Sequence, residues 1–361
     1  MGLKAILLAA ALVVTVYSQC PALSGACRCA PSVYEPVAII SNAFQSFTIL
    51  RLVLNRNTLQ NIDDQAFNGP LLDSLIELDL NDNNLGQIPQ TGIPRLRNLR
   101  KLYLNRNRIN QLSSTAFNAF ESKDLLLKLE LAGNRLTDAT LGDATVFRPL
   151  TLLQFLYMTG NKFPSWAPEM FRYITQLKTL GIGETPISVI PNNAFMHIPN
   201  LIRLEMSEAA VDTIERGAFQ RTPQIQAIGL TDLYSIDLQG NRIDNVQSLG
   251  FANLPAISHL DISYNLLQTM PSDVFQNSFL PQPNDRRVIY ACGNPWYCNS
   301  ELEWFRTLLR DNLDIDVEKP GSSIYNAPLS IVDRPYSTVP PVNLDLPAAY
   351  TLDDRPNNYL Y

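Results

Sequence analysis

The feature that most constrains the fold of this chain is an anchor position, usually asparagine, that recurs every 24 to 32 residues and most often every 24. It sits in the pattern L-x-x-L-x-L-x-x-N-x-L, whose first copy consists of Ile49, Leu52, Leu54, Asn57 and Leu59. Nine clear copies place their anchors at Asn57, Asn83, Asn107, Asn134, Asn161, Thr185, Ala209, Asn241 and Asn265. A period of this length predicts a stack of structural repeats rather than two or three globular domains.

Each copy contains the parts of one stacking unit. Alternating apolar residues before the anchor predict a short strand, and an apolar segment after it predicts a return path with a buried interior. Seven copies place a Phe ten residues after the anchor, at Phe67, Phe117, Phe171, Phe195, Phe219, Phe251 and Phe275. One unit cannot bury such a face alone, so we expect the units to stack.

The anchor asparagine has a predicted structural role. Its side chain can satisfy backbone groups at the turn that leaves the strand. Thr185 is a weaker substitute and Ala209 is none, so we expect the sixth and seventh copies to be looser. In the eighth copy, Ile225-Ile228-Leu230 competes with Leu233-Ile236-Leu238 for the strand, and Asn241 favours the latter. Asn294 belongs to a degenerate tenth copy.

These copies resemble the leucine-rich-repeat family over roughly residues 20 to 315. The resemblance implies an α/β solenoid, a curved leucine-rich-repeat horseshoe. It also implies a parallel β-sheet on the concave face, irregular or short helical segments on the convex face, and binding usually through the concave side. The layout is similar to that of secreted arthropod leucine-rich-repeat proteins such as the non-catalytic subunit of shrimp luciferase, a likeness that does not imply luminescence.

The chain divides into five predicted segments. Lys4 and the apolar run after it predict a signal peptide, with small-residue cleavage after Ser18. No other stretch approaches the roughly 20 apolar residues of a membrane span. The segments are a signal peptide at 1–18, an N-terminal cysteine cap at 19–48, about nine to ten leucine-rich repeats at 49–290, a C-terminal cap with a helix at 291–318, and a Pro/Tyr-rich extended or disordered tail at 319–361.

The five cysteines lie at the two ends of the array, where an oxidising compartment favours disulfides over metal ligation. Both ends resemble the family's caps, but a fourth N-terminal cysteine is missing and Ser300 stands where a later one would fall. The family's order implies a bond between Cys20 and Cys29, and proximity suggests one between Cys292 and Cys298. Cys27 is then left as a free thiol or as the source of an intermolecular bridge.

The net charge of -6 excludes some partner classes. It becomes -7 if Lys4 leaves with the signal peptide, because one positive charge is lost from -6. No run of lysines and arginines interrupts this acidic balance. Nucleic acid and anionic membrane surfaces are therefore poor partners.

Strand alternation identifies the residues that face outward on the concave side. They combine acidic and aromatic side chains, and aromatic surface in a polar field is typical of protein interfaces. The candidate partner-binding residues are Asp79, Tyr103, Glu130, Phe155, Tyr157, Glu205, Asp237, His259 and Asp261. A solvated sheet face whose charges offset one another is the alternative.

An enzyme is disfavoured by the same face. His259 falls near Ser235, Asp237 and Asp261, which could mimic a nucleophile, base and orienting acid. Nothing in the pattern supplies an oxyanion hole or a closed pocket, however, and an open strand surface does not exclude water. We expect no catalytic residues, no cofactor and no metal.

The expected function is that of a secreted, extracellular, non-catalytic binding module whose partner is a protein ligand, a receptor or an enzyme subunit. The alternative is a structural, self-assembling component of a matrix or secretion, as a homodimer. Cys27 and the five tail tyrosines motivate this alternative.

Overall fold

The structure is a computed structural model. It describes residues 42–44, 47–137, 145–220, 230–281, 287–297, 299–312 and 315–316, together with the backbone of 13–15, 27–29 and 36–39. Two compact units make up the chain. Unit 1 comprises Met1–Phe163 and Glu169–Gly181, and unit 2 comprises Pro164–Pro168 and Ile182–Tyr361.

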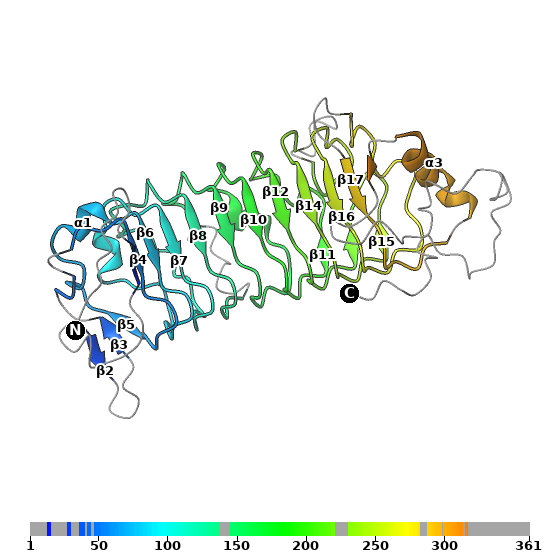
Figure 1. Cartoon of the computed structure of the whole chain (residues 1–361). Helices are drawn as coiled ribbons and strands as arrows, with labels where there is room; N and C mark the ends of the chain where they lie inside the picture. Colours follow the sequence, from blue (N-terminus) through cyan, green and yellow to red (C-terminus); the bar gives the residue numbers. More distant parts are fainter. Residues whose placement is uncertain are drawn as a thin grey trace. The chain divides into compact units, whose positions relative to one another are not determined.

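Unit 1 contains a parallel sheet that takes one strand from each repeat and has β1, which precedes the repeats, at its edge (Figure 1). Its neighbouring strands, in order, are β1 (Val13–Thr15), β4 (Arg51–Val53), β6 (Glu77–Asp79), β7 (Lys101–Tyr103), β8 (Lys128–Glu130), β9 (Phe155–Tyr157) and β10 (Thr179–Gly181). From β4 to β10 the middle residue of each strand is a wholly buried leucine. The pairing therefore keeps identical positions of successive repeats side by side.

Unit 2 repeats this arrangement. Its strands are β12 (Arg203–Glu205), β14 (Ser235–Asp237), β16 (His259–Asp261), β17 (Arg287–Tyr290) and β18 (Ile315–Asp316), paired in that order and all parallel. Strand β14 lies in the register that Asn241 predicted, so the choice of Leu233-Ile236-Leu238 is confirmed. Strand β17 supplies the strand of the degenerate tenth copy.

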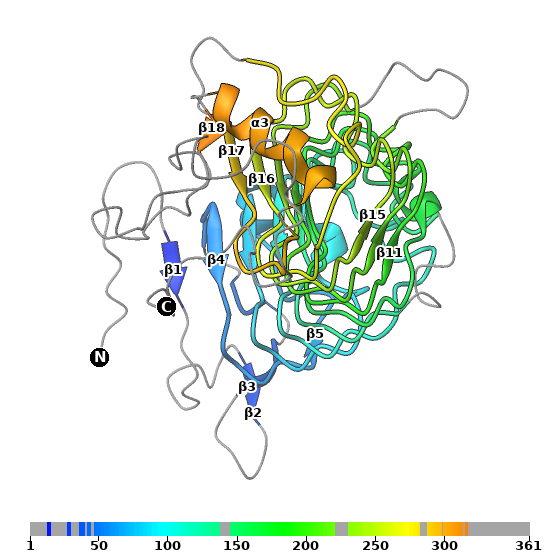
Figure 2. The ribbon, with the colours of Figure 1, turned by 90° about the vertical axis from the view of Figure 1, so that its right-hand side faces the viewer.

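The return segments close each repeat on the side opposite the sheet. In unit 2 they form a small parallel sheet of β11 (Val189–Ile190), β13 (Thr213–Ile214) and β15 (Asn245–Val246). Figure 2 shows β11 and β15 across the coil from β16 and β17. Helical segments on the return side are short: α1 (Leu71–Ser74), η1 (Ile93–Arg95) and η2 (Pro168–Phe171). The expected leucine-rich-repeat solenoid fold is confirmed.

The phenylalanines at the predicted period form the inner stack of the return side. In unit 2 the ring centroids of Phe195 and Phe219 lie 4.9 Å apart, and those of Phe219 and Phe251 lie 5.5 Å apart, with nearly parallel planes. In unit 1 the same place is filled by Phe147, thirteen residues after Asn134, whose ring lies 6.4 Å from that of Phe117. The stack thus tolerates a shift of three residues in the return path.

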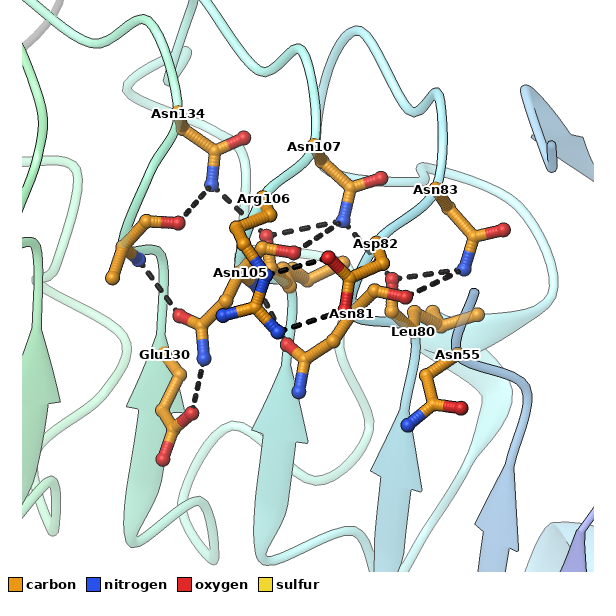
Figure 3. Close-up of polar contacts among 12 residues, drawn as sticks. Asn55, Leu80, Asn81, Asp82, Asn83, Asn105, Arg106, Asn107, Glu130 and Asn134 are labelled. Carbon is orange, nitrogen blue, oxygen red and sulfur yellow. Dashed lines mark hydrogen bonds and ion pairs between the residues drawn. The ribbon is translucent and has the colours of Figure 1, made fainter. Parts of the chain in front are cut away.

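The anchor asparagines form a ladder that joins each repeat to the one before it (Figure 3). The Nδ2 of Asn107 donates to the carbonyl oxygens of Leu104 in its own repeat and Leu80 in the preceding one, at 3.1 and 3.0 Å. Its Oδ1 accepts the N–H of Leu85 at 3.0 Å. The predicted role at the turn is therefore confirmed, and it extends across the repeat boundary. The same three kinds of bond recur at Asn83, Asn134, Asn161, Asn241, Asn265 and Asn294.

The residue directly before each anchor adopts a left-handed backbone conformation, which the sequence analysis missed. Positive φ angles occur at Arg56, Asp82, Arg106, Gly133, Gly160, Glu184, Glu208, Gly240, Tyr264 and Gly293. Four of these ten residues are glycine, the residue that adopts this conformation without steric cost, and that recurrence was the available signal. The turn is thus the same in every repeat, even where its side chain differs.

The ladder is interrupted at the two anchors that are not asparagine. The Thr185 Oγ1 donates to the carbonyl of Ile182 at 3.0 Å, which reproduces one of the asparagine's bonds. Ala209 is buried and has no polar side-chain atom, so it offers no acceptor to the Ile187 N–H and no donor to the Ile182 carbonyl. Because buried backbone groups are normally hydrogen-bonded, this interruption costs stability in unit 2.

Replacing Ala209 with asparagine is expected to raise the free energy of unfolding of the full chain by about 1 to 2 kcal/mol. The new Oδ1 would accept from Ile187 and the new Nδ2 would donate to Ile182, and each net hydrogen bond contributes about 0.5–1.5 kcal/mol. Denaturant unfolding followed by circular dichroism measures the change. The control is Ala210→Asn, which adds the same side chain one residue outside the ladder; an equal gain in both variants would rule out ladder repair.

Both ends of the array carry additional elements. At the N-terminal end, β2 (Cys27–Cys29) pairs antiparallel with β3 (Pro36–Ile39), and β3 pairs parallel with β5 (Asn61–Ile62). At the C-terminal end, η3 (Ser300–Leu302) leads into α3 (Glu303–Asp311), whose Phe305 and Leu309 are buried. The Nε1 of the wholly buried Trp296 donates to the carbonyl of Ala291 at 2.8 Å.

Several sequence-based predictions fall on residues outside the described ones. Cys20 and Cys298 are among them, so both disulfide pairings remain predictions, as does the role of Cys27. Strand β1 lies within the predicted signal peptide, and cleavage after Ser18 would remove it from the edge of β4. The tail from residue 319 onward also lies outside the described part.

Candidate partner-binding site

The candidate site is the sheet face, meaning the outward residues on either side of the buried middle residue of each strand. In unit 1 the strand pairing brings together five of the predicted residues, from β6 to β9: Asp79, Tyr103, Glu130, Phe155 and Tyr157. In unit 2 it brings together the other four, from β12 to β16: Glu205, Asp237, His259 and Asp261. Each group comes from strands that are 24 to 32 residues apart in the sequence.

A lysine between two tyrosines is the centre of the unit 1 face. The Nζ of Lys128 lies 5.3 Å from the ring centroid of Tyr103 and 5.1 Å from that of Tyr157. The same Nζ forms an ion pair of 2.8 Å with Oε1 of Glu130 on its own strand. A cation over an aromatic face is attracted by the ring quadrupole, so Lys128 holds both rings in place. Phe155, beside Lys128 in the strand pairing, extends the aromatic surface.

The glycine of β10 makes room for the second tyrosine. A Cβ atom on Gly181 would lie 2.6 Å from Cδ1 of Tyr157, which is closer than van der Waals contact allows. Because Gly181 has no side chain, the Tyr157 ring can extend over it along the sheet. This role of Gly181 was not predicted from the sequence.

Charged residues surround Tyr103. Glu77 forms ion pairs with Arg51 at 2.8 Å and with Lys101 at 3.5 Å, and these residues border the aromatic cluster. Burial raises the pKa of Tyr103 to about 12, and the negative charges of Glu77 and Glu130 act in the same direction. Its phenol therefore remains a neutral hydrogen-bond donor throughout the physiological pH range.

The Tyr103 phenol is expected to titrate near pH 12 instead of near the ordinary value of 10. The stabilisation that comes from the neutral phenol is present below about pH 10 and is lost as the pH rises through about 12. The difference in ultraviolet absorbance between the wild type and Tyr103→Phe isolates this one group. Glu77→Gln should move the midpoint downward, whereas a wild-type midpoint near 10 would contradict the assigned environment.

Three acids of the predicted face stabilise turns. One carboxylate oxygen of Asp79 accepts the N–H of Asn81 at 2.9 Å. Asp237 and Asp261 do the same for the residue two positions on, at 3.0 Å each. Asp79 is only 7% exposed, and its burial is the main cause that raises its pKa. In all three cases the aspartate accepts the N–H of the residue two positions later, and this spacing was visible in the sequence.

The two glutamates of the same column are paired on their own strands. Glu130 binds Lys128, and Oε1 of Glu205 lies 2.8 Å from Nε of Arg203. The Arg203–Glu205 pair is the more exposed of the two, and exposed ion pairs contribute about 0–1 kcal/mol to stability. The carboxylates of Glu130 and Glu205 are therefore less available to a partner than the acidic composition of the face suggested. The aromatic cluster of β7–β9 is the stronger candidate anchor.

The four residues of unit 2 that were weighed for catalysis and rejected, Ser235, Asp237, His259 and Asp261, lie on neighbouring strands. The pairing of β14 with β16 sets Ser235 beside His259 and Asp237 beside Asp261. The His259 ring lies 4.9 Å from the ring of Tyr234, tilted by 40°. Since Asp237 and Asp261 also accept backbone N–H groups at turns, a structural role accounts for these two carboxylates.

A second row of asparagines, which the sequence analysis did not single out, lies at the end of the unit 1 strands (Figure 3). The Oδ1 of Asn81 accepts the N–H of Asn105 at 2.7 Å, and the Oδ1 of Asn105 accepts the N–H of Ala132 at 2.8 Å. The Nδ2 of Asn105 also donates to Glu130. This row connects the turns directly to the candidate face and restrains Glu130 from one side.

The comparisons with known proteins agree with this geometry. The family model described as leucine rich repeat matches residues 48–109 and 231–278. The chain folds as a leucine-rich-repeat solenoid. One relative, the zebrafish (Danio rerio) leucine-rich repeat and fibronectin type III domain-containing protein 1, is 35% identical over 89 residues. That match covers 23% of this chain and 15% of the relative.

Solved leucine-rich-repeat structures are similar in fold. A chain of the Toll–Spatzle complex of Drosophila matches 79% of this chain and 36% of its own length, with a TM-score of 0.56 and 20% identity. A chain of the octameric complex of Latrophilin 3, Unc5D and FLRT2 matches 81% of this chain and 91% of its own length, with a TM-score of 0.56 and 23% identity. At these identities the likeness establishes the fold.

The described part of the chain has no group of three or more His, Cys, Asp and Glu residues arranged to hold a metal ion. Within the same residues, no helix has the length and apolar composition needed to cross a membrane.

Proposed function

We propose that this chain is a secreted, extracellular, non-catalytic leucine-rich-repeat module that binds a protein partner through the sheet face of unit 1. The observation that carries this proposal is the cluster of Tyr103, Phe155 and Tyr157 around Lys128. Large aromatic side chains bury much area at little entropic cost and dominate the binding energy of protein interfaces. Glu77 and Lys101, at the border, provide the polar rim that such an anchor patch needs.

The comparisons support a protein as the partner class. Both solved structures described above come from complexes with other proteins, by their titles. Their likeness to this chain extends to the fold alone. The evidence for a binding role is therefore the sheet face of unit 1. A predicted signal peptide, which includes Lys4 and Ser18, supports secretion.

Several observations support a non-catalytic role. The candidate face is the outward side of a sheet, and catalysis by a nucleophile and base needs a site that excludes water. The carboxylates of Asp237 and Asp261 accept backbone N–H groups at turns, which gives both residues a structural role. The family model and the relative described above are of leucine-rich-repeat proteins, and neither description names an enzyme.

The test is capture of a partner from the fluid or tissue that contains the chain, with wild-type and variant proteins as bait. The double variant Tyr103→Ala/Tyr157→Ala should reduce capture of the wild-type partner at least tenfold, because truncating an anchor residue costs about 2 kcal/mol or more. Gly181→Ala should also weaken capture, because its Cβ displaces the Tyr157 ring without removing it.

The control bait is Tyr297→Ala, which removes an exposed tyrosine of unit 2 outside the sheet face. It should capture the partner as well as the wild type does. Equal capture by the double variant and the wild type, with circular dichroism showing both folded, would contradict the proposed site.

A further inference from the structure

The basic edge is a row of exposed cations on unit 1 that lies outside the sheet face. It consists of Arg108, Arg135 and Lys162, each directly after the anchor asparagine of three consecutive repeats. Their backbone N–H groups donate to Leu85, Ile109 and Leu136 of the preceding repeat, at 2.8 to 2.9 Å. This common bonding pattern fixes the three residues at equivalent places, one per repeat. Parallel neighbours in such a stack are about 4.8 Å apart.

No charge within the described residues neutralises this row. Arg106, one position before Asn107, forms an ion pair with Asp82, and Arg97 forms ion pairs with Asp73 and Glu121. Arg108, Arg135 and Lys162 take part in none of the ion pairs among the described residues. Three cations in a line, none of them in an ion pair with another described residue, attract a surface of opposite charge.

The chain itself has such a surface, because its charge is divided very unevenly. Residues 19–181 contain 16 lysines and arginines against 13 aspartates and glutamates, a net charge of +3. Residues 182–318 contain 8 against 17, a net charge of -9. The overall charge of the chain conceals this division. The three residues of the basic edge are about 27 positions apart in sequence, so they do not form a run that the sequence would reveal.

The acidic edge is the corresponding turn region of unit 2. It consists of Glu184, Glu208 and Asp244, all exposed and each from a different repeat. Glu184 and Glu208 hold the left-handed position before consecutive anchors, where their N–H groups donate to Ser207 and Gln239 at 2.9 and 2.8 Å. Asp244 lies three residues after Asn241, with its N–H donated to Asp212. Glu184 and Glu208 thus occupy the same place in consecutive repeats, and Asp244 occupies a different place in the next repeat.

We propose that the basic edge of unit 1 binds the acidic edge of unit 2 in a second copy of this chain. Three cations then face three anions, of which Glu184 and Glu208 have the one-repeat spacing of the basic edge. Two such contacts related by a two-fold axis close a dimer, whereas single contacts extend into chains. This self-association goes beyond the proposed function and leaves the aromatic cluster of β7–β9 for a different partner.

A nucleic acid fits the basic edge less well than a second copy does. Duplex DNA carries about one negative charge per 1.7 Å of its axis, roughly three times denser than the row. It would also be repelled by the net charge of -9 on residues 182–318. The acidic edge is opposite to the row in charge, and its Glu184 and Glu208 have the spacing of one repeat.

The test is sedimentation equilibrium of the full chain at low and high salt. The wild type should associate at about 20 mM salt, with an association constant at least tenfold lower at about 500 mM, because salt screens exposed charges. Two variants reverse the edges: Arg108→Glu/Arg135→Glu/Lys162→Glu and Glu184→Lys/Glu208→Lys/Asp244→Lys. Each alone should be monomeric at low salt, and an equimolar mixture should associate again, because each reversed edge meets an opposite charge on the other variant.

The control for net charge is Arg97→Glu/Arg172→Glu/Lys178→Glu, which changes the charge of unit 1 equally at exposed positions outside the row. It should associate like the wild type, and circular dichroism verifies the fold of every variant. A wild type that is monomeric at low salt would overturn the proposal. This holds even if its basic edge binds a polyanion such as heparin. Loss of association in the control, or failure of the mixture to associate, would overturn it as well.

Discussion

Replacing Asn107 with alanine is expected to lower the free energy of unfolding by about 2 to 4 kcal/mol. The Leu85 N–H would lose its acceptor in a buried place, and an unsatisfied buried group costs about 1–3 kcal/mol. The carbonyls of Leu80 and Leu104 would each lose one of two donors, since Asn83 and Asn134 also donate to them. This redundancy keeps the expected loss below that of three independent orphaned groups.

Denaturant unfolding gives the size of this effect, and hydrogen exchange shows where it occurs. The amide of Leu85 should exchange much faster in the variant than in the wild type. Asn110→Ala is the matched control, because Asn110 is exposed and lies three residues beyond the ladder. If both variants lose the same stability, the ladder does not connect the repeats in the way described.

Replacing Phe219 with alanine is expected to cost about 3 to 5 kcal/mol, which is typical of a buried phenylalanine. Its ring is wholly buried between those of Phe195 and Phe251, at 4.9 and 5.5 Å, so truncation leaves a cavity in the stack. Because each repeat contacts its neighbours alone, the loosening should be greatest in β12 and β14.

Hydrogen exchange read strand by strand tests this prediction together with the unfolding midpoint. Phe219→Leu is the control, since it retains most of the buried volume and should lose clearly less stability than the alanine variant. A cost below about 1 kcal/mol for Phe219→Ala would mean that the phenylalanine stack is not part of the core.

Periodicity predicted which residues share a column, because a solenoid places equivalent positions of successive repeats side by side. The strands, the register at Leu233-Ile236-Leu238 and the burial of Phe219 all followed from it. Phe147 did not, because its repeat has a longer return path that shifts the ring to thirteen residues after the anchor. The buried interior is filled by an aromatic ring at this place in the stack, although the number of residues between the anchor and the ring varies.

The candidate face was harder to predict, because the position of a residue within its repeat does not determine which group its side chain contacts. Asp79 shares its column with Glu130, yet Asp79 binds the N–H of Asn81 and is nearly buried, while Glu130 binds Lys128. The position of Lys128 between two rings depends on rotamers and on the space above Gly181. Such contacts across neighbouring strands leave no short motif in the sequence.

Hydroxyl-radical footprinting of the chain, free and bound to its captured partner, tests the central claim most directly, since it measures the solvent exposure of individual aromatic side chains. We expect Tyr103, Phe155 and Tyr157 to become protected in the complex. We also expect unchanged reactivity at Tyr264 and Tyr297, which are 51% and 38% exposed and belong to unit 2. Protection of Tyr264 and Tyr297 with unchanged reactivity at Tyr103 and Tyr157 would contradict the assignment of the partner to the sheet face of unit 1.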